Sequence, residues 1–119
     1  CTMMSTIHSV LSGLGAYAKQ IEVSANNVAN VNTDGFKKSH TELISVETGG
    51  VLPVVQKDNS AGPTVLRDRG YGPTQVELSN VDLGEETVNR IIGQRGFEAN
   101  LQVLKTADDM LGSLLDIKK

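Results

Sequence analysis

The chain has no tryptophan, and only two phenylalanines and two tyrosines occur among its 119 residues. Aromatic side chains bury the most area per residue and dominate most globular cores. Since aromatics make up only 3% of the sequence, a thick, rounded core is not expected. The length leaves room for one ordinary domain.

Cysteine is nearly absent as well. The single thiol, at Cys1, can form no internal disulfide and is too little for a structural zinc site. Its place at position 1 is expected to reflect processing, cloning or numbering, with Met3 or Met4 as the natural start, or else a lipid-modified N-terminus. No run of about 18 apolar residues occurs, so no transmembrane helix is predicted. No signal peptide is recognisable either, which predicts export without a cleaved signal, or a signal already removed.

Groups that could carry chemistry are few and scattered. Eleven basic and fourteen acidic residues give a net charge of −3, which predicts no general attraction to nucleic acid. His8 and His40 have no partners at metal-ligand spacing, and a solvated face is the expected role of Asp108, Asp109 and Asp116. The Gly-rich stretch 70–73 lacks the lysine and the following helix of a phosphate loop. We therefore predict no enzyme, with no catalytic, cofactor-binding or metal-binding residues.

The stretch from Ile7 to Asn32 organises the chain, because its apolar residues recur at alternating spacings of four and three. This is the a/d pattern of three heptads. A helix over this stretch would be about 33 Å long and would need a partner to bury its stripe. An ordinary amphipathic core helix is the alternative to a coiled coil. The seam consists of Ile7, Leu11, Leu14, Ala18, Ile21, Ala25 and Val28.

Small and polar residues modify this first helix. Gly13 and Gly15 each cost about 1 kcal/mol of helix propensity relative to alanine, so they either allow close approach of another backbone or are tolerated weak points. The helix end is rich in asparagine, whose amide favours helix ends and turns, and we expect these carboxamides to bond neighbouring segments. A turn at Asp34-Gly35 follows. The asparagines are Asn26, Asn27, Asn30 and Asn32.

In residues 41–78 the apolar residues recur with a period near two, which predicts a small, loop-rich β region. Strands are expected at 43–46 and 51–56, joined by a hairpin turn at Gly49-Gly50, and at 63–67 and 74–78. The region has few large apolar groups and would be marginal alone, so we expect it to lean on the helices or on a neighbouring subunit.

A second helix is predicted from Leu83 to about Leu115, roughly 50 Å long. Asp82 as N-cap with Glu85 three residues later has the form of a capping box. Its apolar residues form two stripes, so the helix should contact more than one neighbour. One stripe contains Val88, Ile92, Ala99, Val103, Ala107, Met110, Leu114 and Ile117, and the other Ile91, Phe97, Leu101, Leu104, Leu111 and Leu115.

Two stretches resemble the signatures of bacterial flagellar rod and hook proteins, the axial proteins of the basal body. SANNVANVNTDGFK at 24–37 resembles their N-terminal signature. LSNVDLGEE at 78–86, QRGFEAN at 94–100 and TADDML at 106–111 resemble their C-terminal signature. Together the two regions cover about two-thirds of the chain. The residues that carry the resemblance include Asn26, Asn27, Asn30, Asn32, Gly35, Phe36, Asn80, Asp82, Glu85, Arg95 and Asn100.

The resemblance implies a mainly α fold with a small β region, in which long terminal helices pair as a coiled coil. It divides one structural unit into 1–40, 41–78 and 79–119. It also implies a structural subunit that assembles with copies of itself and with other rod and hook proteins into a torque-transmitting shaft. Such proteins pass through the flagellar type III export apparatus without signal cleavage and reside in the periplasm-spanning rod. Val88, Ile92, Val103, Leu104, Ala107, Leu111 and Leu114 would complete the assembly interface with the first-helix seam.

Several alternatives stay open from the sequence. The short middle resembles that of proximal-rod members, whereas residues 32–37 look more like the longer distal-rod and hook type. A shortened paralogue or an engineered truncation would also fit. A coiled-coil adaptor that no longer polymerises is the second functional hypothesis, and an enzyme with a site between subunits is the third.

Overall fold

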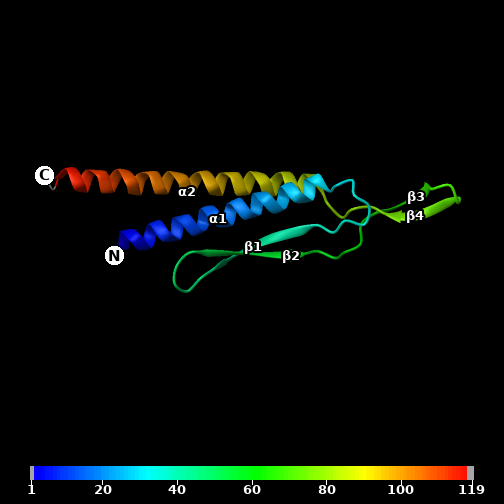
Figure 1. The fold of residues 1–119 in the computed structure, drawn as a ribbon, viewed down its shortest axis with the longest axis horizontal. Coiled ribbons are helices and arrows are strands. Elements are labelled where there is room, and N and C mark those ends of the chain that lie inside the picture. The colour runs from blue at the N-terminus through cyan, green and yellow to red at the C-terminus, as the bar shows by residue number, and fades with distance from the viewer. Residues whose placement is uncertain (1, 118–119) are drawn as a thin grey trace.

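The computed structural model describes residues 2–117, with side chains from residue 4, so Cys1 lies outside the described residues. The molecule is a narrow rod with extents of 81 × 24 × 17 Å. Two long helices lie side by side in opposite directions, and both chain ends lie at the same end of the rod (Figure 1). The β segments lie between the helices in the chain, so the predicted mainly helical fold with a small β region is confirmed.

Helix α1 spans Thr2–Ala29. It begins before Ile7, where the predicted stretch starts, and it ends before Asn30 and Asn32, which lie in the turn that follows. The turn closes through Asn30 N–H, which donates to the carbonyl oxygens of Asn26 and Asn27 at 3.2 and 3.1 Å. Gly35 has φ of +72°, which confirms the predicted turn and explains glycine there.

Helix α2 spans Leu83–Ile117, close to the predicted range. Asp82 caps it as predicted, since its Oδ1 accepts from Gly84 N at 2.8 Å and from Glu85 N at 3.4 Å. The reciprocal half of the capping box does not form. Glu85 accepts instead from Lys38 Nζ at 3.0 Å, because a nearby ammonium is a stronger partner than a backbone N–H.

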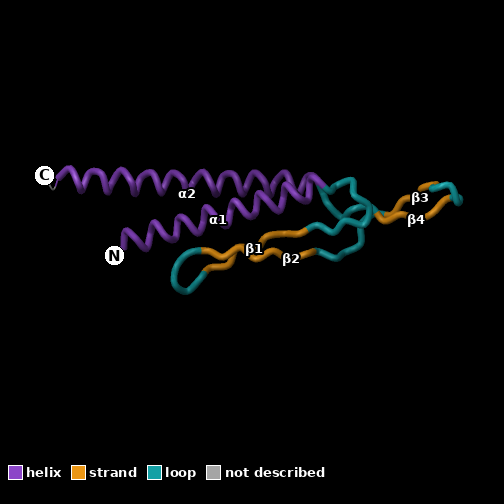
Figure 2. Tube along the Cα trace, in the orientation of Figure 1, coloured by secondary structure: helices purple, strands orange, loops and turns teal. Residues whose placement is uncertain are grey.

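The β residues form two separate antiparallel hairpins (Figure 2). The first joins β1 (Ser39–Ser45) to β2 (Val51–Lys57), and its turn contains Gly49 and Gly50 at φ of +91° and +101°, as predicted. The second joins β3 (Thr64–Asp68) to β4 (Pro73–Glu77).

The two hairpins differ in their support. The β1–β2 hairpin lies along α1, where Val51 N–H donates to Ser12 Oγ at 3.0 Å. A side chain at Gly50 would approach that same Oγ to 2.6 Å, so the hairpin backbone runs close to the helix. The β3–β4 hairpin lies at the end of the rod that is opposite the chain termini (Figure 1). In the described part of the chain it packs against neither helix. The expectation that the β region leans on a helix is therefore confirmed for the first hairpin only.

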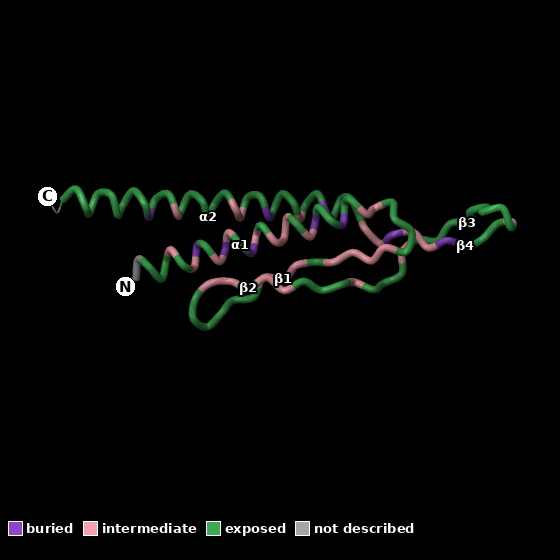
Figure 3. The backbone as a smooth tube through the Cα atoms, in the orientation of Figure 1, coloured by how far each residue is buried: buried purple, intermediate pink, exposed green. Residues whose placement is uncertain are grey.

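The interior is thin, as the shortage of aromatics predicts. Purple buried segments in Figure 3 are short and concentrate where α1 meets α2. Among the described residues, buried polar side chains are as numerous as buried apolar ones. The buried apolar residues are Val10, Ala16, Val76 and Ala107, and the buried polar ones are Ser24, Asn27, Ser79 and Glu86.

Glycines set the close approach of the two helices. A Cβ at Gly96 would lie 2.5 Å from the Tyr17 ring, and one at Gly93 would lie 2.8 Å from Ile21 Cγ1. Gly13 faces the Asn100 amide, whose nearest atom would be 3.0 Å from an added Cβ. Close approach therefore explains Gly13, whereas a Cβ at Gly15 would meet nothing within 4 Å.

Candidate assembly surface and the junction that positions it

Three segments, α1, β1 and α2, meet where α1 ends and α2 begins. We call this region the junction, and it consists of Ser24, Asn27, Ser39 and Glu86. The Asn27 amide nitrogen donates to Glu86 Oε1 at 2.9 Å and to Ser39 O at 2.6 Å, and its Oδ1 accepts from Ser39 N at 3.0 Å. Ser24 Oγ donates to the Glu86 carbonyl at 3.1 Å. The Asn27 and Glu86 side chains are 1% and 2% exposed, so the bonds form away from water, where a missing partner would be costly.

A second group of bonds lies beside the junction and joins residues 79 and 80 to the loops. Asn80 Oδ1 accepts from Lys38 N at 2.7 Å, and its amide donates to the carbonyls of Asp58 and Ser60 at 2.9 and 3.0 Å. Ser79 Oγ donates to the Val31 carbonyl. The two stretches that resemble the family signatures therefore meet in space. The expected bonding of the helix-end asparagine amides to neighbouring segments is confirmed for Asn27, and Asn80 bonds to neighbouring segments in the same way.

Charged pairs surround the junction. The bond and charge of Glu85 raise the pKa of Lys38 above its ordinary 10.5. Lys37 Nζ donates to Glu77 Oε1, which also accepts from Gly62 N at 3.1 Å, and these donors hold the pKa of Glu77 below its ordinary 4.5. Both pairs are partly or largely solvated, so each contributes modestly to stability.

The predicted α1 seam is split lengthwise. Its members at 7, 14 and 21 are half-buried, whereas Leu11, Ala18 and Ala25 are exposed, with Leu11 at 52%. Val28 is 37% exposed. The buried face of α1 lies beside this seam and includes Val10, Gly13 and Ala16. One part of the seam is thus partly covered within the molecule, with Ile21 against Gly93 of α2, and the other part faces solvent.

The α2 residues assigned to the assembly interface divide in the same way. Ala107 is buried and Leu104 is half-buried. Large apolar side chains elsewhere on α2 are about half exposed, and those toward its end are more so. The exposed interface candidates are Val88 at 54%, Ile92 at 51%, Val103 at 47%, Leu111 at 36% and Leu114 at 57%.

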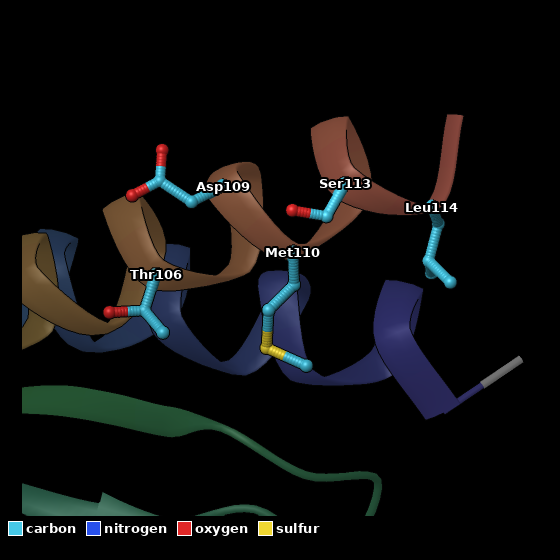
Figure 4. A pocket seen from close by; sticks show the side chains of 5 residues that line it. All are labelled: Thr106, Asp109, Met110, Ser113 and Leu114. Carbon is cyan, nitrogen blue, oxygen red and sulfur yellow. The ribbon is translucent and has the colours of Figure 1, made fainter. Parts of the chain in front are cut away.

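A shallow hollow of about 360 Å³ lies along the last third of α2. Its lining consists of Thr106, Asp109, Met110, Ser113 and Leu114 (Figure 4). In that view Met110 extends below the helix, while Asp109 points to the other side. All five residues come from one helix, so the hollow is a groove on an uncovered helix face rather than an enclosed ligand pocket.

The remaining signature residues are either exposed or take part in hydrogen bonds and ion pairs outside the junction. Asn26 and Asn32 are exposed, and the Asn30 amide donates to Asn26 O at 2.9 Å. The Phe36 carbonyl accepts from Asn80 N at 3.3 Å. Arg95 pairs with Glu98 at 3.2 Å on the solvated face, and the Asn100 amide donates to Gly96 O at 3.1 Å.

The sequence interpretation missed three junction residues: Ser24, Ser39 and Glu86. It placed Glu86 only within the stretch 78–86 that resembles the C-terminal signature. A signal for its burial was present, because Glu86, Gly93, Asn100 and Ala107 recur every seven residues, and all four are buried or half-buried. A search for heptads of apolar residues does not detect this repeat, because only one of its four members is apolar.

Groups considered for chemistry lie apart on the surface. His8, His40 and the acidic residues at 108, 109 and 116 are exposed. Arg67 and Arg69 both pair with Asp34, at 2.7 and 3.3 Å. Within residues 2–117, no three His, Cys, Asp or Glu side chains cluster in a way that could hold a metal ion. Neither long helix has an apolar run sufficient to cross a membrane within the described residues.

Comparison with known proteins identifies both ends of the chain. Residues 74–117 match the family described as flagellar basal body rod FlgEFG protein C-terminal, and residues 8–37 match the flagella basal body rod protein family. The basal-body rod protein FlgG of Bacillus subtilis is 30% identical over 93 residues, which are 77% of this chain and 33% of FlgG.

Hook proteins match as well. FlgE of Borreliella burgdorferi is 42% identical over 109 residues, 88% of this chain and 23% of FlgE. FlgE of Escherichia coli is 44% identical over 43 residues, 36% of this chain and 11% of FlgE. The chain thus spans a third or less of the length of these three relatives. All are rod or hook proteins, and no enzyme family is indicated by these matches.

Proposed function

Because this chain belongs to the flagellar basal-body rod and hook protein family, we propose that it is a structural subunit of the rod. In this role it joins copies of itself and other rod and hook proteins through the exposed apolar faces of α1 and α2. The helices of successive copies pack into a helical shaft that transmits torque for motility.

The observation that carries this proposal is the apolar surface that α1 and α2 leave uncovered. Exposed large apolar side chains line α2 from Leu83 to Ile117, with Ile117 at 81% and Leu115 at 69%. Single exposed apolar residues are ordinary, but contiguous ones mark interaction sites. A helix that is apolar on two faces and covered on one supports contact with a further helix.

The shape and the polar junction also fit a shaft subunit. A rod 81 Å long can lie lengthwise in a larger shaft. The junction holds α1, α2 and the first hairpin together by bonds that water does not reach, so load on one helix passes to the other. We further propose that the protein reaches the periplasm-spanning rod through the flagellar type III export apparatus, with no signal cleaved.

Leu111→Asp tests the assembly role. Leu111 is 36% exposed in the single copy, so the variant should retain its helical circular dichroism. In an assembly the added carboxylate would be buried without a partner, which costs several kcal/mol. We expect at least a tenfold rise in the concentration needed for filament formation, measured by sedimentation and electron microscopy, and loss of motility in cells that carry the variant. Leu104→Asp should also prevent assembly, but since Leu104 is half-buried it should destabilise the single copy too.

Gln102→Asp is the matched control, because Gln102 is exposed and already polar. It should assemble like the parent. If Leu111→Asp forms normal rods in motile cells, the proposal is wrong. If the parent protein forms only small, closed oligomers, the non-polymerising adaptor becomes the better description.

A further inference from the structure

A polar pocket of about 280 Å³ lies beside the junction, where α1, β1 and the first turns of α2 meet. All three elements contribute to its lining, unlike the groove near the end of α2, and Val23 is the only apolar residue among the described ones that line it. Small-molecule sites usually measure about 300–1,000 Å³. This pocket is therefore large enough for one side chain, or for several water molecules of about 30 Å³ each.

Glu86 brings a buried carboxylate to this pocket without a cation in contact with it. The residue is only 2% exposed. Asn27 Nδ2 donates to Oε1 at 2.9 Å, and Oε2 accepts no hydrogen bond from the residues that the structure describes. Buried carboxylates are normally paired with a cation or bound to a metal ion, because burial without a partner is costly. A group of opposite charge beside Oε2 would therefore stabilise this arrangement.

The ammonium of Lys38 does not fill this role. Its Nζ donates to Glu85 at 3.0 Å and lies 3.9 Å from Asp58 Oδ2. The bond to Glu85 is the main reason that the pKa of Lys38 is raised, and the charges of Glu85, Asp58 and Glu86 add to it against the effect of burial. Three carboxylates thus act on one ammonium, so negative charge is in excess here and attracts a second cation.

Two neutral polar atoms of the lining are also unused within the chain. Gln20 Oε1 and Thr41 Oγ1 are buried and have no hydrogen-bond partner among the described residues. Native proteins leave few such atoms, and each is usually explained by water or by a bound group. The N–H donors of an organic cation match carboxylate, amide and hydroxyl oxygens together. A metal ion fits less well, since no three His, Cys, Asp or Glu side chains of residues 2–117 cluster around one point.

We propose that this pocket binds one organic cation, a guanidinium or ammonium group, between Glu86 on α2, Gln20 on α1 and Thr41 on β1. A guanidinium has five N–H donors in a planar fork and can therefore serve several oxygens at once. The surrounding protein keeps water from the ion pair and strengthens it. Two sources can supply the group. A basic side chain of a neighbouring subunit is one, and it rests on the proposed function; a free amine in solution is the other, and it does not.

Binding to single copies tests the site. The probe is N-acetyl-arginine methylamide, whose guanidinium is its one charge, added at low salt and below the assembly concentration. We expect a dissociation constant of the order of millimolar, measured by chemical-shift changes of the amides of 39–41 and 85–89 in nuclear magnetic resonance spectra. The uncharged N-acetyl-citrulline methylamide is the matched probe and should bind at least about tenfold more weakly. If the arginine probe causes no localised changes, the pocket holds water only and the proposal is wrong.

Substitutions separate binding from folding. Thr41→Val removes a hydroxyl that bonds nothing in the chain, so the variant should resist urea at least as well as the parent, while binding weakens about threefold or more. Glu86→Gln retains an acceptor for Asn27 and should weaken binding about tenfold or more. Lys38→Gln removes the competing ammonium and should strengthen binding. A merely structural role of these residues predicts no such opposite changes in affinity.

Thr64→Val and Asp108→Asn are matched controls, since both residues are exposed and lie away from the pocket. Each should bind the probe like the parent. Unchanged binding in Thr41→Val and Glu86→Gln would overturn the proposal. If one of these two variants fails to fold, the other still decides, because each changes a different contact of the same cation.

Filament formation distinguishes the two sources. If a neighbouring subunit supplies the cation, the arginine probe should compete with it and raise the concentration needed for assembly, whereas the citrulline probe should not. An unchanged concentration, with binding to single copies intact, would rule out the neighbouring subunit and leave a free amine as the ligand. If the parent itself forms no filaments, the proposed function fails, while the binding measurement on single copies still decides the site.

Discussion

The junction and the far end of α2 are stabilised in opposite ways. At the junction, the side chains of Ser24, Asn27 and Glu86 are buried and hydrogen-bonded, and Asn27 also bonds to the backbone of Ser39 in β1. From residue 108 to 117, every residue of α2 is exposed, although leucine, methionine and isoleucine occur among them. The junction is complete within one chain, whereas the far end of α2 presents apolar surface with nothing to cover it. Such a subunit is packed within itself at the junction and leaves apolar helix surface free for contact at the far end of α2.

The largest expected effect is on the junction. Asn27→Ala removes the donor to Glu86 and both bonds to Ser39, and should lower the free energy of unfolding by about 3 kcal/mol. Urea denaturation followed by circular dichroism measures this loss. Asn26→Ala is the control, because the neighbouring side chain is exposed, and should change stability by less than about 0.5 kcal/mol. Equal effects of the two substitutions would remove the contrast between the regions.

Amide hydrogen exchange should separate the two parts of α2 in a single copy. Residues near Gly93 pack against α1, so their amides should exchange about 100-fold or more slowly than those of 108–117, where local opening is easy. Exchange followed by mass spectrometry measures the difference. The far end should become protected in assembled filaments, while the first turns of α2 change little. Uniform exchange along α2 would contradict the comparison.

Adding one methyl group should have opposite effects in the two regions. Gly96→Ala forces Cβ against the Tyr17 ring and should cost about 1–2 kcal/mol despite better helix propensity. Gly112→Ala meets nothing within 4 Å, and should stabilise by up to about 1 kcal/mol. Thermal unfolding of both variants beside the parent measures whether each substitution lowers or raises stability. Stabilisation by Gly96→Ala would show that the helices do not approach closely there.

The smallest expected effect concerns pH. Lys37 lowers the pKa of Glu77 in the folded state, so Glu77 contributes stability above its ordinary pKa of 4.5. That contribution is lost as the pH falls through the lowered folded value. The stability difference between the parent and Glu77→Gln should therefore be present at pH 6 and shrink as the pH falls below about 4. Glu47→Gln, at an exposed turn position, provides the control, and a pH-independent difference for Glu77→Gln would refute the pairing.

Much of the local structure could be predicted because its causes are local. The asparagine-rich helix end, Asp82 as a cap and the Gly49-Gly50 turn act through backbone geometry within a few residues. Glu86 could not be placed in this way. A glutamate in the first turn of a helix ordinarily faces solvent, and only the distant Asn27 amide makes its burial tolerable.

The sequence by itself determined the two long helices, the two hairpins between them and the shortage of large side chains that makes the molecule thin, because periodicity and turn residues act along the chain. Only the tertiary structure decided which face of α1 is buried. That choice depends on Gly93, Gly96 and Glu86, which contact α1 across more than fifty residues of intervening chain. The apolar seam of α1 identifies surface that must be covered, but the fit and hydrogen bonds of the partner helix determine how much of it the molecule covers itself.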